Sequence, residues 1–144
     1  MISTKGRYGL RVMIDLAENN NDRYIPLKDI AARQDISKKY LEIIVKELVS
    51  GKLLTGVSGK GGGYKLNRSP EDYKVGDILR ATEGSLAPVA CLECDAKPCE
   101  RAAECRTLPM WEKFNTLINN FFDGITIADL MKNKTESGYF GAAL

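Results

Sequence analysis

The residues best suited to chemistry in this chain are its four cysteines, which all fall within fifteen residues. They are Cys91, Cys94, Cys99 and Cys105, separated by gaps of two, four and five residues. In a reducing compartment such a stretch is more typical of metal binding or redox chemistry than of a disulfide framework. Structural zinc usually takes two close cysteine pairs, whereas here one pair is followed by wider gaps. Thiolates on one loop suit an iron-sulfur cluster at least as well, and zinc or cofactor-free thiol switching stay open.

The chain contains no histidine. This excludes Ser-His and Cys-His catalytic pairs and removes the commonest neutral metal ligand. A cysteine nucleophile would depend on a lysine or a carboxylate as its base, and neither stands at a recognisable spacing. We therefore expect a protein that is not an enzyme.

The composition is that of an ordinary globular protein, with 144 residues of which 44% are hydrophobic and 28% charged. No apolar run approaches the roughly 20 residues of a membrane span. The N-terminus lacks the apolar core of a secretory signal, because Arg7, Arg11 and Asp15 interrupt the first patterned segment. We expect a cytoplasmic protein that makes no contact with a membrane.

The net charge of +2 conceals two unlike halves. Residues 1–68 hold 13 Lys and Arg against 7 Asp and Glu, a balance of +6, whereas the remaining residues hold 8 against 12, a balance of −4. A basic half joined to an acidic half is expected when one part of a protein meets phosphate and the other does not. The charge pattern therefore favours a nucleic-acid partner for the N-terminal half.

The basic half is patterned as three helices followed by a hairpin. Apolar residues recur at helical spacing in three segments, of which the first is capped by Ser3 or Thr4 and the third by Ser37. Only Asp35-Ile36-Ser37 separates the second from the third, and two short helices joined by so brief a turn match a helix-turn-helix. The segments are residues 3–18, residues 25–33 beginning at Ile25-Pro26-Leu27, and the helix after Ser37 with its apolar stripe Leu41, Ile44, Val45 and Leu48.

The hairpin that follows has a cationic glycine tip. Residues 53–58 and 64–66 predict two strands, joined by Gly59-Lys60-Gly61-Gly62-Gly63. Such a tip can approach a phosphate backbone or a minor groove closely, and Lys60 supplies the charge. A nucleotide-binding loop is the alternative, but this segment lacks the Gly-Lys-Ser/Thr of a P-loop and opens no helix. We predict a winged helix-turn-helix that binds double-stranded DNA.

The DNA-facing residues are expected mainly on the third helix, on the side opposite its apolar stripe. Cations there can contact phosphates, while shorter polar groups near the N-terminal turns can reach base edges in the major groove. A solvated helix face that is merely basic is the alternative. The candidate DNA-binding residues are Arg7, Lys28, Ser37, Lys38, Lys39, Tyr40, Glu42, Lys46, Ser58 and Lys60.

The acidic half contains a helix ending near Glu83-Gly84 and a longer helix from about Thr107 to Asp123. The longer helix is rich in aromatic residues at heptad-like spacing, so it needs a cover. A second copy of the chain would provide one and give a homodimer able to read a palindromic operator, and packing within one subunit is the alternative. The candidate interface residues are Leu108, Trp111, Phe114, Ile118, Phe121 and Phe122.

These segments define the expected organisation: a mainly α fold with a small β-wing, in which a winged helix-turn-helix is joined to a long dimerisation helix. We expect a DNA-binding domain at residues 1–84 and a cysteine-rich loop at residues 85–106. Residues 107–132 should form the dimerisation helix and a short last helix capped by Thr126, and residues 133–144 a mobile tail.

Four parts of the sequence resemble the IscR, NsrR and CymR family of bacterial winged-helix regulators, and the IscR branch most of all. They are Ser3-Thr4-Lys5-Gly6-Arg7-Tyr8, the segment from Ile36 to Glu42, Gly61-Gly62-Gly63-Tyr64, and Cys91 to Cys105 followed by Trp111. The resemblance implies a repressor or activator that senses iron-sulfur status through a 2Fe-2S cluster and controls genes of cluster biogenesis. By position, Cys91, Cys99 and Cys105 match the three cysteines of the IscR branch.

Two departures from the IscR pattern leave the fourth cluster ligand open. That branch has a histidine three residues after its last cysteine, where this chain has Leu108, and the gap from Cys91 to Cys99 is longer and contains the extra Cys94. The candidates are Cys94, a carboxylate such as Glu42 or Asp95, or a group of the other subunit, and we favour Cys94 because thiolate binds iron better than carboxylate. Nitric oxide sensing, thiol-redox sensing and a zinc-stabilised interaction module remain alternatives.

The resemblance also suggests how a signal would reach DNA. We hypothesise that cluster binding orders the cysteine loop and its attachment to the dimerisation helix, which changes the spacing or exposure of the recognition helices. Glu42 would matter most, because a carboxylate on the DNA face either accepts a hydrogen bond from a cytosine amino group or repels phosphate.

Overall fold

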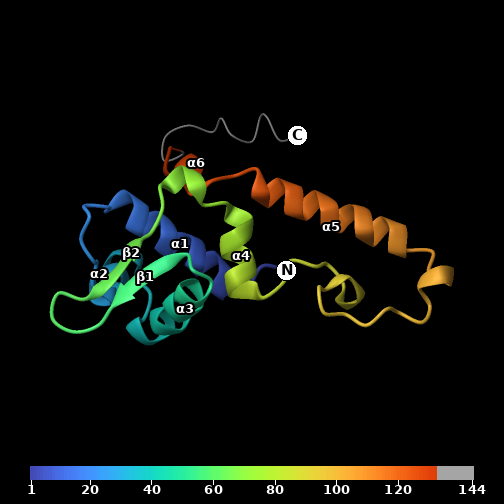
Figure 1. Cartoon of the computed structure of the whole chain (residues 1–144), viewed down its shortest axis with the longest axis horizontal. Helices are drawn as coiled ribbons and strands as arrows, with labels where there is room; N and C mark the ends of the chain where they lie inside the picture. The colour runs from blue at the N-terminus through green and yellow to red at the C-terminus, as the bar shows by residue number, and fades with distance from the viewer. Residues whose placement is uncertain (133–144) are drawn as a thin grey trace.

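The computed structural model describes residues 1–132 and shows a helical head from which one long helix projects (Figure 1). The head contains α1 (Thr4–Glu18), α2 (Leu27–Gln34), α3 (Lys38–Ser50), β1 (Leu54–Val57), β2 (Gly63–Leu66), η1 (Pro70–Asp72), α4 (Val75–Glu83) and α6 (Ile127–Lys132). The projecting helix is α5 (Leu108–Asp123), and the loop before it carries the short turns η2 (Ala90–Leu92) and η3 (Ala102–Glu104). The expected mainly α fold with a small β-wing is confirmed.

α1 runs through the centre of the head. Ser3 caps it as expected, because the Ser3 side chain accepts a hydrogen bond from the Gly6 N–H. Its inner side contributes Val12, Met13 and Leu16 to the core, each no more than 1% exposed. Burying several such side chains, at about 1.5–3 kcal/mol each, is the main stabilisation available to a head of this size.

The helix-turn-helix forms where the sequence predicts it. α2 ends at Asp35, which adopts the left-handed conformation with φ 52°, and its backbone N–H donates to the Ala31 carbonyl. Ser37 then caps α3 by accepting a hydrogen bond from the Tyr40 N–H at 3.2 Å. The apolar stripe of α3 is buried against the core, so its opposite side faces away from the head.

The wing is a two-stranded antiparallel sheet with a third chain segment at its edge. Leu54 pairs with Leu66 and Val57 with Gly63, and Ile25 forms an isolated bridge with Tyr64. The prediction that the second helix begins at Ile25 is therefore wrong, because a residue before proline is disfavoured in helical conformation. Gly63 allows this approach: a Cβ there would lie 2.2 Å from the Ile25 carbonyl oxygen.

α4 packs against α1 through small residues. A Cβ on Gly9 would lie 2.9 Å from the Thr82 side chain, and Ser3 donates hydrogen bonds from its N–H and its hydroxyl to Glu83 at 2.9 and 2.6 Å. Before α4, the fully buried Tyr73 donates its hydroxyl proton to the Leu53 carbonyl at 2.9 Å, which ties α4 to the base of the wing.

The segment between Leu86 and Ile127 contains no buried residue. α5 projects from the head with its C-terminal end beside α4 (Figure 1). α6, which we grouped with α5 from the sequence, packs into the core of the head, where Ile127 is fully buried. Thr126 caps α6 as expected, since its hydroxyl accepts from the Asp129 N–H at 3.1 Å. The tail expected to be mobile, residues 133–144, lies outside the described residues. No helix within residues 1–132 is long and apolar enough to span a bilayer.

Candidate nucleic-acid interface and cysteine loop

The outward side of α3 carries the predicted DNA-facing residues. Lys38, Lys39, Glu42 and Lys46 are all exposed, whereas Leu41, Ile44, Val45 and Leu48 are buried on the opposite side. Within residues 1–132 none of these three lysines forms an ion pair, so their charges are available to an external anion. The structure therefore presents three unpaired cations and one carboxylate on a single helix face.

Two of the predicted DNA-facing residues also have structural contacts. The Ser37 hydroxyl is engaged as the cap of α3. Tyr40 is half-buried, and its ring meets the Tyr8 ring edge-on with 5.8 Å between centroids. The Arg11 guanidinium stacks over the Tyr8 ring, 5.0 Å from its centroid. This cluster fixes the start of α3 against α1, and contact of Ser37 or Tyr40 with DNA remains a prediction.

The remaining predicted DNA-facing residues, three cations and Ser58, lie on elements other than α3. Arg7 and Lys28 are exposed near the starts of α1 and α2, and Ser58 and Lys60 are exposed at the wing. Arg7 donates to the Thr4 hydroxyl at 3.1 Å. In the wing tip, Gly59 and Gly61 have φ of 90° and 77°, a conformation that residues with a Cβ rarely adopt. The glycines therefore permit a tight tip with a single long side chain, that of Lys60.

An ion pair between the buried Asp15 and the exposed Arg33, which sequence reasoning missed, holds α2 in place. Asp15 is 2% exposed and accepts two hydrogen bonds from the Arg33 guanidinium, at 3.0 and 2.7 Å, and one from the Gln34 amide at 2.9 Å. Asp15 holds the pKa of Arg33 above its ordinary value through these bonds. The sequence offered one signal for this pair: Asp15 stands among the apolar residues of the first helix, where a charged side chain needs a partner. The pair joins the central helix to the first helix of the helix-turn-helix.

A second ion pair engages Lys5, a cation that is not among the predicted DNA-facing residues. The Lys5 ammonium lies 2.8 Å from the Glu47 carboxylate, which joins α1 to α3, and this hydrogen bond raises the pKa of Lys5. The other oxygen of Glu47 is buried and has no hydrogen-bond partner among the described residues. Lys5 therefore positions α3 and is not a free cation like Lys39 or Lys46.

All four thiols are free and lie on the loop before α5. Cys91, Cys94 and Cys99 are exposed, and Cys105 is half-buried. Cys105 comes just before the N-terminus of α5, with its sulfur 3.5 Å from the Thr107 hydroxyl. Hydrogen bonds from Thr107, together with the Leu108 N–H and the charge of Arg101, lower the pKa of the Cys105 thiol. Cys105 is therefore the thiol of this loop with a structural reason to ionise.

The donor set of the loop fits an iron-sulfur cluster in kind. Free thiolates are the ligands that such clusters take, and the loop is largely irregular in structure, so its backbone can adjust around a bound group. Within residues 1–132 no three cysteine or carboxylate side chains are already gathered as a metal site. Glu42 lies on α3, whereas Asp95 lies in the loop with the cysteines.

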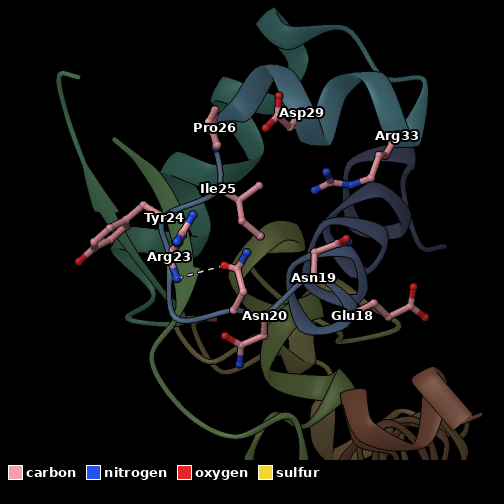
Figure 2. Close-up of a pocket in the computed structure, with 10 residues that line it drawn as sticks. Glu18, Asn19, Asn20, Arg23, Tyr24, Ile25, Pro26, Asp29 and Arg33 are labelled. Carbon is pink, nitrogen blue, oxygen red and sulfur yellow. Dashed lines mark hydrogen bonds between the residues drawn. The ribbon is translucent and has the colours of Figure 1, made fainter. Parts of the chain in front are cut away.

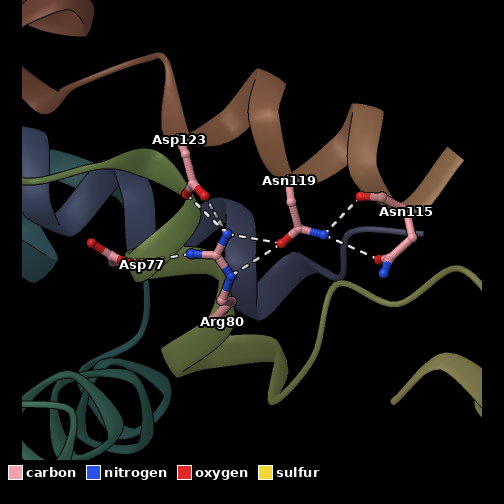
Figure 3. A network of polar contacts seen from close by, with 5 residues as sticks. All are labelled: Asp77, Arg80, Asn115, Asn119 and Asp123. Atoms are coloured by element: carbon pink, nitrogen blue, oxygen red, sulfur yellow. Dashed lines mark hydrogen bonds and ion pairs between the residues drawn. The ribbon is translucent and has the colours of Figure 1, made fainter. Parts of the chain in front are cut away.

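A polar network fixes the base of α5 on α4 (Figure 3). Arg80 donates to both carboxylate oxygens of Asp123 at 2.9 and 2.8 Å, to the Asn119 side-chain oxygen at 2.8 Å, and to Asp77 at 3.1 Å. Asn119 in turn donates to Asn115 one turn earlier. A Cβ on Gly76 would lie 2.0 Å from an Asp123 oxygen, so α4 approaches α5 where it lacks a side chain. This network connects the head to residues 87–123, which comprise the cysteine loop and α5 and which we call the arm.

The apolar residues of α5 form two stripes, where the sequence analysis treated them as one. Ile118 and Phe122 pack inward against Val75, Leu79 and Leu86. Leu108 and Trp111 are half-exposed. A second stripe points outward and includes two residues absent from the predicted interface, which the spacing of four, three and four could have revealed. It consists of Met110 at 53% exposure, Phe114 at 45%, Leu117 at 57% and Phe121 at 39%, and we call it the outer stripe.

An open hollow of about 480 Å³ lies between the end of α1 and the start of α2 (Figure 2). Its lining includes Asn20, Arg23, Tyr24 and Asp29. None of the residues predicted to contact DNA or a cluster lines it. The hollow is therefore separate from both sites.

Comparison with known proteins gives one consistent result. A family model described as Rrf2, iron-dependent transcriptional regulator, matches residues 2–133. The chain is 37% identical over 132 residues to protein rrf2 of Nitratidesulfovibrio vulgaris, covering 92% of this chain and 87% of that protein. It is 37% identical to the regulator CymR of Bacillus subtilis, covering 90% and 88%, and 35% identical to the regulator IscR of Aliivibrio salmonicida, covering 90% and 76%.

Solved structures agree with these sequences. The structure of CymR, described as the global cysteine regulator of B. subtilis, superposes with a TM-score of 0.71 at 36% identity, covering 92% of this chain and 96% of that one. The structure of T. potens IscR superposes with a TM-score of 0.69 at 36% identity, covering 98% and 96%. The similarity thus extends over both the head and the arm.

Proposed function

The chain belongs to the Rrf2 family of transcriptional regulators, and from this premise we propose that it is a dimeric DNA-binding regulator that senses iron-sulfur status. In this proposal the arm holds a 2Fe-2S cluster, and the head reads a palindromic operator at genes of cluster biogenesis. The observation that carries the proposal is the placement of four free thiols on the loop leading into α5, whose base is attached to the head through Arg80.

DNA reading is assigned to the outward side of α3 and to the wing. Lys38, Lys39 and Lys46 would contact phosphates, and Glu42 would accept a hydrogen bond from a cytosine amino group. Lys60 at the wing tip, with Arg7 and Lys28, would contact the backbone beside the recognition helix. Each phosphate contact made by a lysine adds to the salt dependence of binding, so affinity should fall steeply as salt is raised.

Cys91, Cys99 and Cys105 would hold the cluster, with Cys94 as the fourth ligand. A bound 2Fe-2S cluster supplies a reversible one-electron centre whose presence reports iron and sulfide supply. The chain's own contribution is to present thiolates, and Cys105 is favoured in this by the Thr107 hydrogen bond that lowers its pKa. Because Cys105 adjoins α5, ordering of the loop would change how α5 is held.

A contiguous set of contacts links α5 to α3, whose outward side, together with the wing, forms the proposed DNA-reading surface. Asp123 of α5 accepts hydrogen bonds from Arg80 of α4. The residue after Arg80, Ala81, packs closely against the C-terminal end of α3, since a Cβ added to Gly51 there would lie 3.3 Å from the Ala81 side chain. A shift of α5 would therefore act on α3 through one intervening helix. Two copies joined along the outer stripe would carry two such heads, in agreement with a two-fold operator.

Cofactor-free thiol sensing is the second candidate, and the lowered pKa of Cys105 favours it. A thiolate is the nucleophile in thiol-disulfide exchange, so a partly ionised Cys105 would react with an oxidised low-molecular-weight disulfide before the other cysteines do. Both candidates use the same loop and the same connection to the head. They differ in whether the protein carries iron and sulfide when it is isolated.

The deciding experiment is anaerobic purification of the full chain, with a visible absorption spectrum and parallel iron, sulfide and zinc analysis. The proposal predicts a coloured protein with equimolar iron and sulfide, whose colour is lost in Cys91→Ser, Cys99→Ser and Cys105→Ser. Cys94→Ser tests the fourth ligand, and Asp95→Asn is its matched control. A colourless protein without zinc but with a reactive Cys105 would support the thiol switch, and a zinc-loaded protein would contradict both.

A further inference from the structure

The exposed large apolar side chains of residues 1–132 gather on two surfaces. Apart from Met1 at the chain end, four of them form the outer stripe of α5, and the others are Ile43 and Val49 on α3 and Val57 in the wing. The second copy of the chain proposed above would cover the outer stripe. The apolar residues on the reading surface have no cover within the described chain and call for a separate explanation.

Ile43 stands in the middle of the cationic face of α3. It is 49% exposed, and by the 3.6-residue repeat it points within roughly 30° of the direction opposite the buried stripe, together with Lys39 and Lys46. These lysines precede and follow it by four and three residues, so they are its neighbours on the helix surface. Any duplex that the two lysines bind must also meet the Ile43 side chain.

Isolated exposed apolar residues are common on protein surfaces, and what distinguishes Ile43 is this position. A recognition helix enters the major groove, where the bases present hydrogen-bonding groups and one apolar group, the C5 methyl of thymine. A β-branched side chain is stiff at χ1, so little rotamer freedom is lost when it makes such a contact. Beside a guanine or cytosine edge, Ile43 would instead cover polar groups without bonding them, which is unfavourable.

We propose that Ile43 is a specificity-determining residue that contacts the C5 methyl of a thymine in each half of the operator. The proposal rests on DNA reading by α3, as argued above, and adds a base that the helix selects. Glu42 selects through a hydrogen bond and Ile43 through apolar contact, so the two residues discriminate by different chemistry at successive positions of the helix.

The test begins with selection of bound duplexes from a random pool by the full-length protein, followed by replacement of each selected thymine with deoxyuridine. Deoxyuridine pairs as thymine does and lacks only the methyl group. At the contacted thymine we expect the affinity of the protein for the duplex to fall about four-fold for each half-site, because one methyl group fewer is buried on binding. For Ile43→Ala the same replacement should have no effect, while replacement at other thymines behaves as in the unchanged protein.

Two further variants sharpen the result. Val49→Ala removes an apolar side chain, 37% exposed, at the last turn of the same helix and away from its outward centre, so it should leave the deoxyuridine profile unchanged. Ile43→Gln introduces an amide that pairs with the N6 and N7 positions of adenine, and its selected sequences should gain adenine at that position.

The outcomes separate this inference from the proposed function. A protein that enriches no sequence from the pool contradicts DNA reading by α3, and the thymine contact with it. A protein that enriches one operator whose deoxyuridine profile is identical in the unchanged protein and in Ile43→Ala contradicts the thymine contact alone.

Discussion

The head and the arm of this molecule are built on different principles. Every α-helix of the head contributes buried side chains to one core, whereas no residue between Leu86 and Ile127 is buried. The head is thus closed by its own contacts, and the arm leaves thiols and apolar side chains exposed in a single chain. We therefore expect the head to read DNA as a preformed unit and the arm to be completed by a bound group or by a second copy of the chain.

The difference extends to the ion pairs. Asp15 and Arg33 join two helices inside the head with an almost fully buried carboxylate. Arg80 and Asp123 join the head to the arm with both groups about one-third exposed. Exposed pairs contribute little to stability because water screens them, so the second pair is better suited to set an orientation than to stabilise the fold.

The largest effect is expected inside the head, from Arg33→Met. Its removal leaves the Asp15 carboxylate buried with only the Gln34 amide as a side-chain donor. An uncompensated buried charge costs about 3–5 kcal/mol. Chemical denaturation should show this loss in the free energy of unfolding, against Arg23→Met as a control on an exposed arginine without an ion pair in the described chain. Equal stability of the two variants would contradict the view that the head depends on this pair.

Leu117→Glu should break the arm and spare the head. Leu117 is 57% exposed in the outer stripe. In a two-fold interface each subunit would carry the substitution, so two carboxylates would be introduced into the apolar contact. We expect the dimer to weaken by at least about 100-fold, equivalent to about 2.8 kcal/mol. Analytical ultracentrifugation measures this, and circular dichroism should show an unchanged helical content. Thr116→Glu, one residue away and outside the outer stripe, is the control, and equal dissociation of both variants would refute the assignment of the outer stripe.

The elements of the head were predictable from sequence because each is specified locally. Ser3 and Ser37 cap helices whose apolar spacing is regular, and glycines between two short strand patterns predict the tip of a hairpin. Ile25 was misplaced because its conformation is decided by Pro26 and by pairing with Tyr64, which lies 39 residues later in the chain. A contact of that separation leaves no periodic signal, and neither does the partnership of Asp15 with Arg33.

In the arm the sequence predicted the residue types better than their arrangement. The sequence assigned six apolar positions of α5 to one interface, but the division into an inner and an outer stripe depends on where α4 meets the helix. That contact is set by Gly76 and Arg80, neither of which stands out in the sequence. The cysteine ligands remain predictions, because their spacing is compatible with several bound groups.

Arg80→Met should loosen the connection between the two regions with little loss of stability. Its partners Asp77 and Asp123 are 44% and 35% exposed, so screening limits the expected cost to about 1 kcal/mol. The expected consequence is a smaller ratio of DNA affinities between cluster-loaded and cluster-free protein, measured by fluorescence anisotropy. Lys113→Met, on an exposed cation of α5 that forms no ion pair within residues 1–132, should keep the ratio. An unchanged ratio in Arg80→Met would show that the signal takes another route.

The smallest effect concerns the arm alone and follows from the lowered pKa of Cys105. At neutral pH a thiol with a lowered pKa is more ionised than an ordinary one, so iodoacetamide should modify Cys105 a few times faster than Cys91 in cluster-free protein. The advantage should shrink as pH rises toward the ordinary thiol pKa, because the lowered pKa of Cys105 then gives it no further gain in thiolate. Thr107→Val removes the hydrogen bond between the Thr107 hydroxyl and the sulfur and should reduce the advantage, whereas Thr116→Val on the same helix should not. Mass spectrometry of the modified peptides across pH gives both rates, and identical pH profiles for Cys105 and Cys91 would mean that the start of α5 does not favour the thiolate.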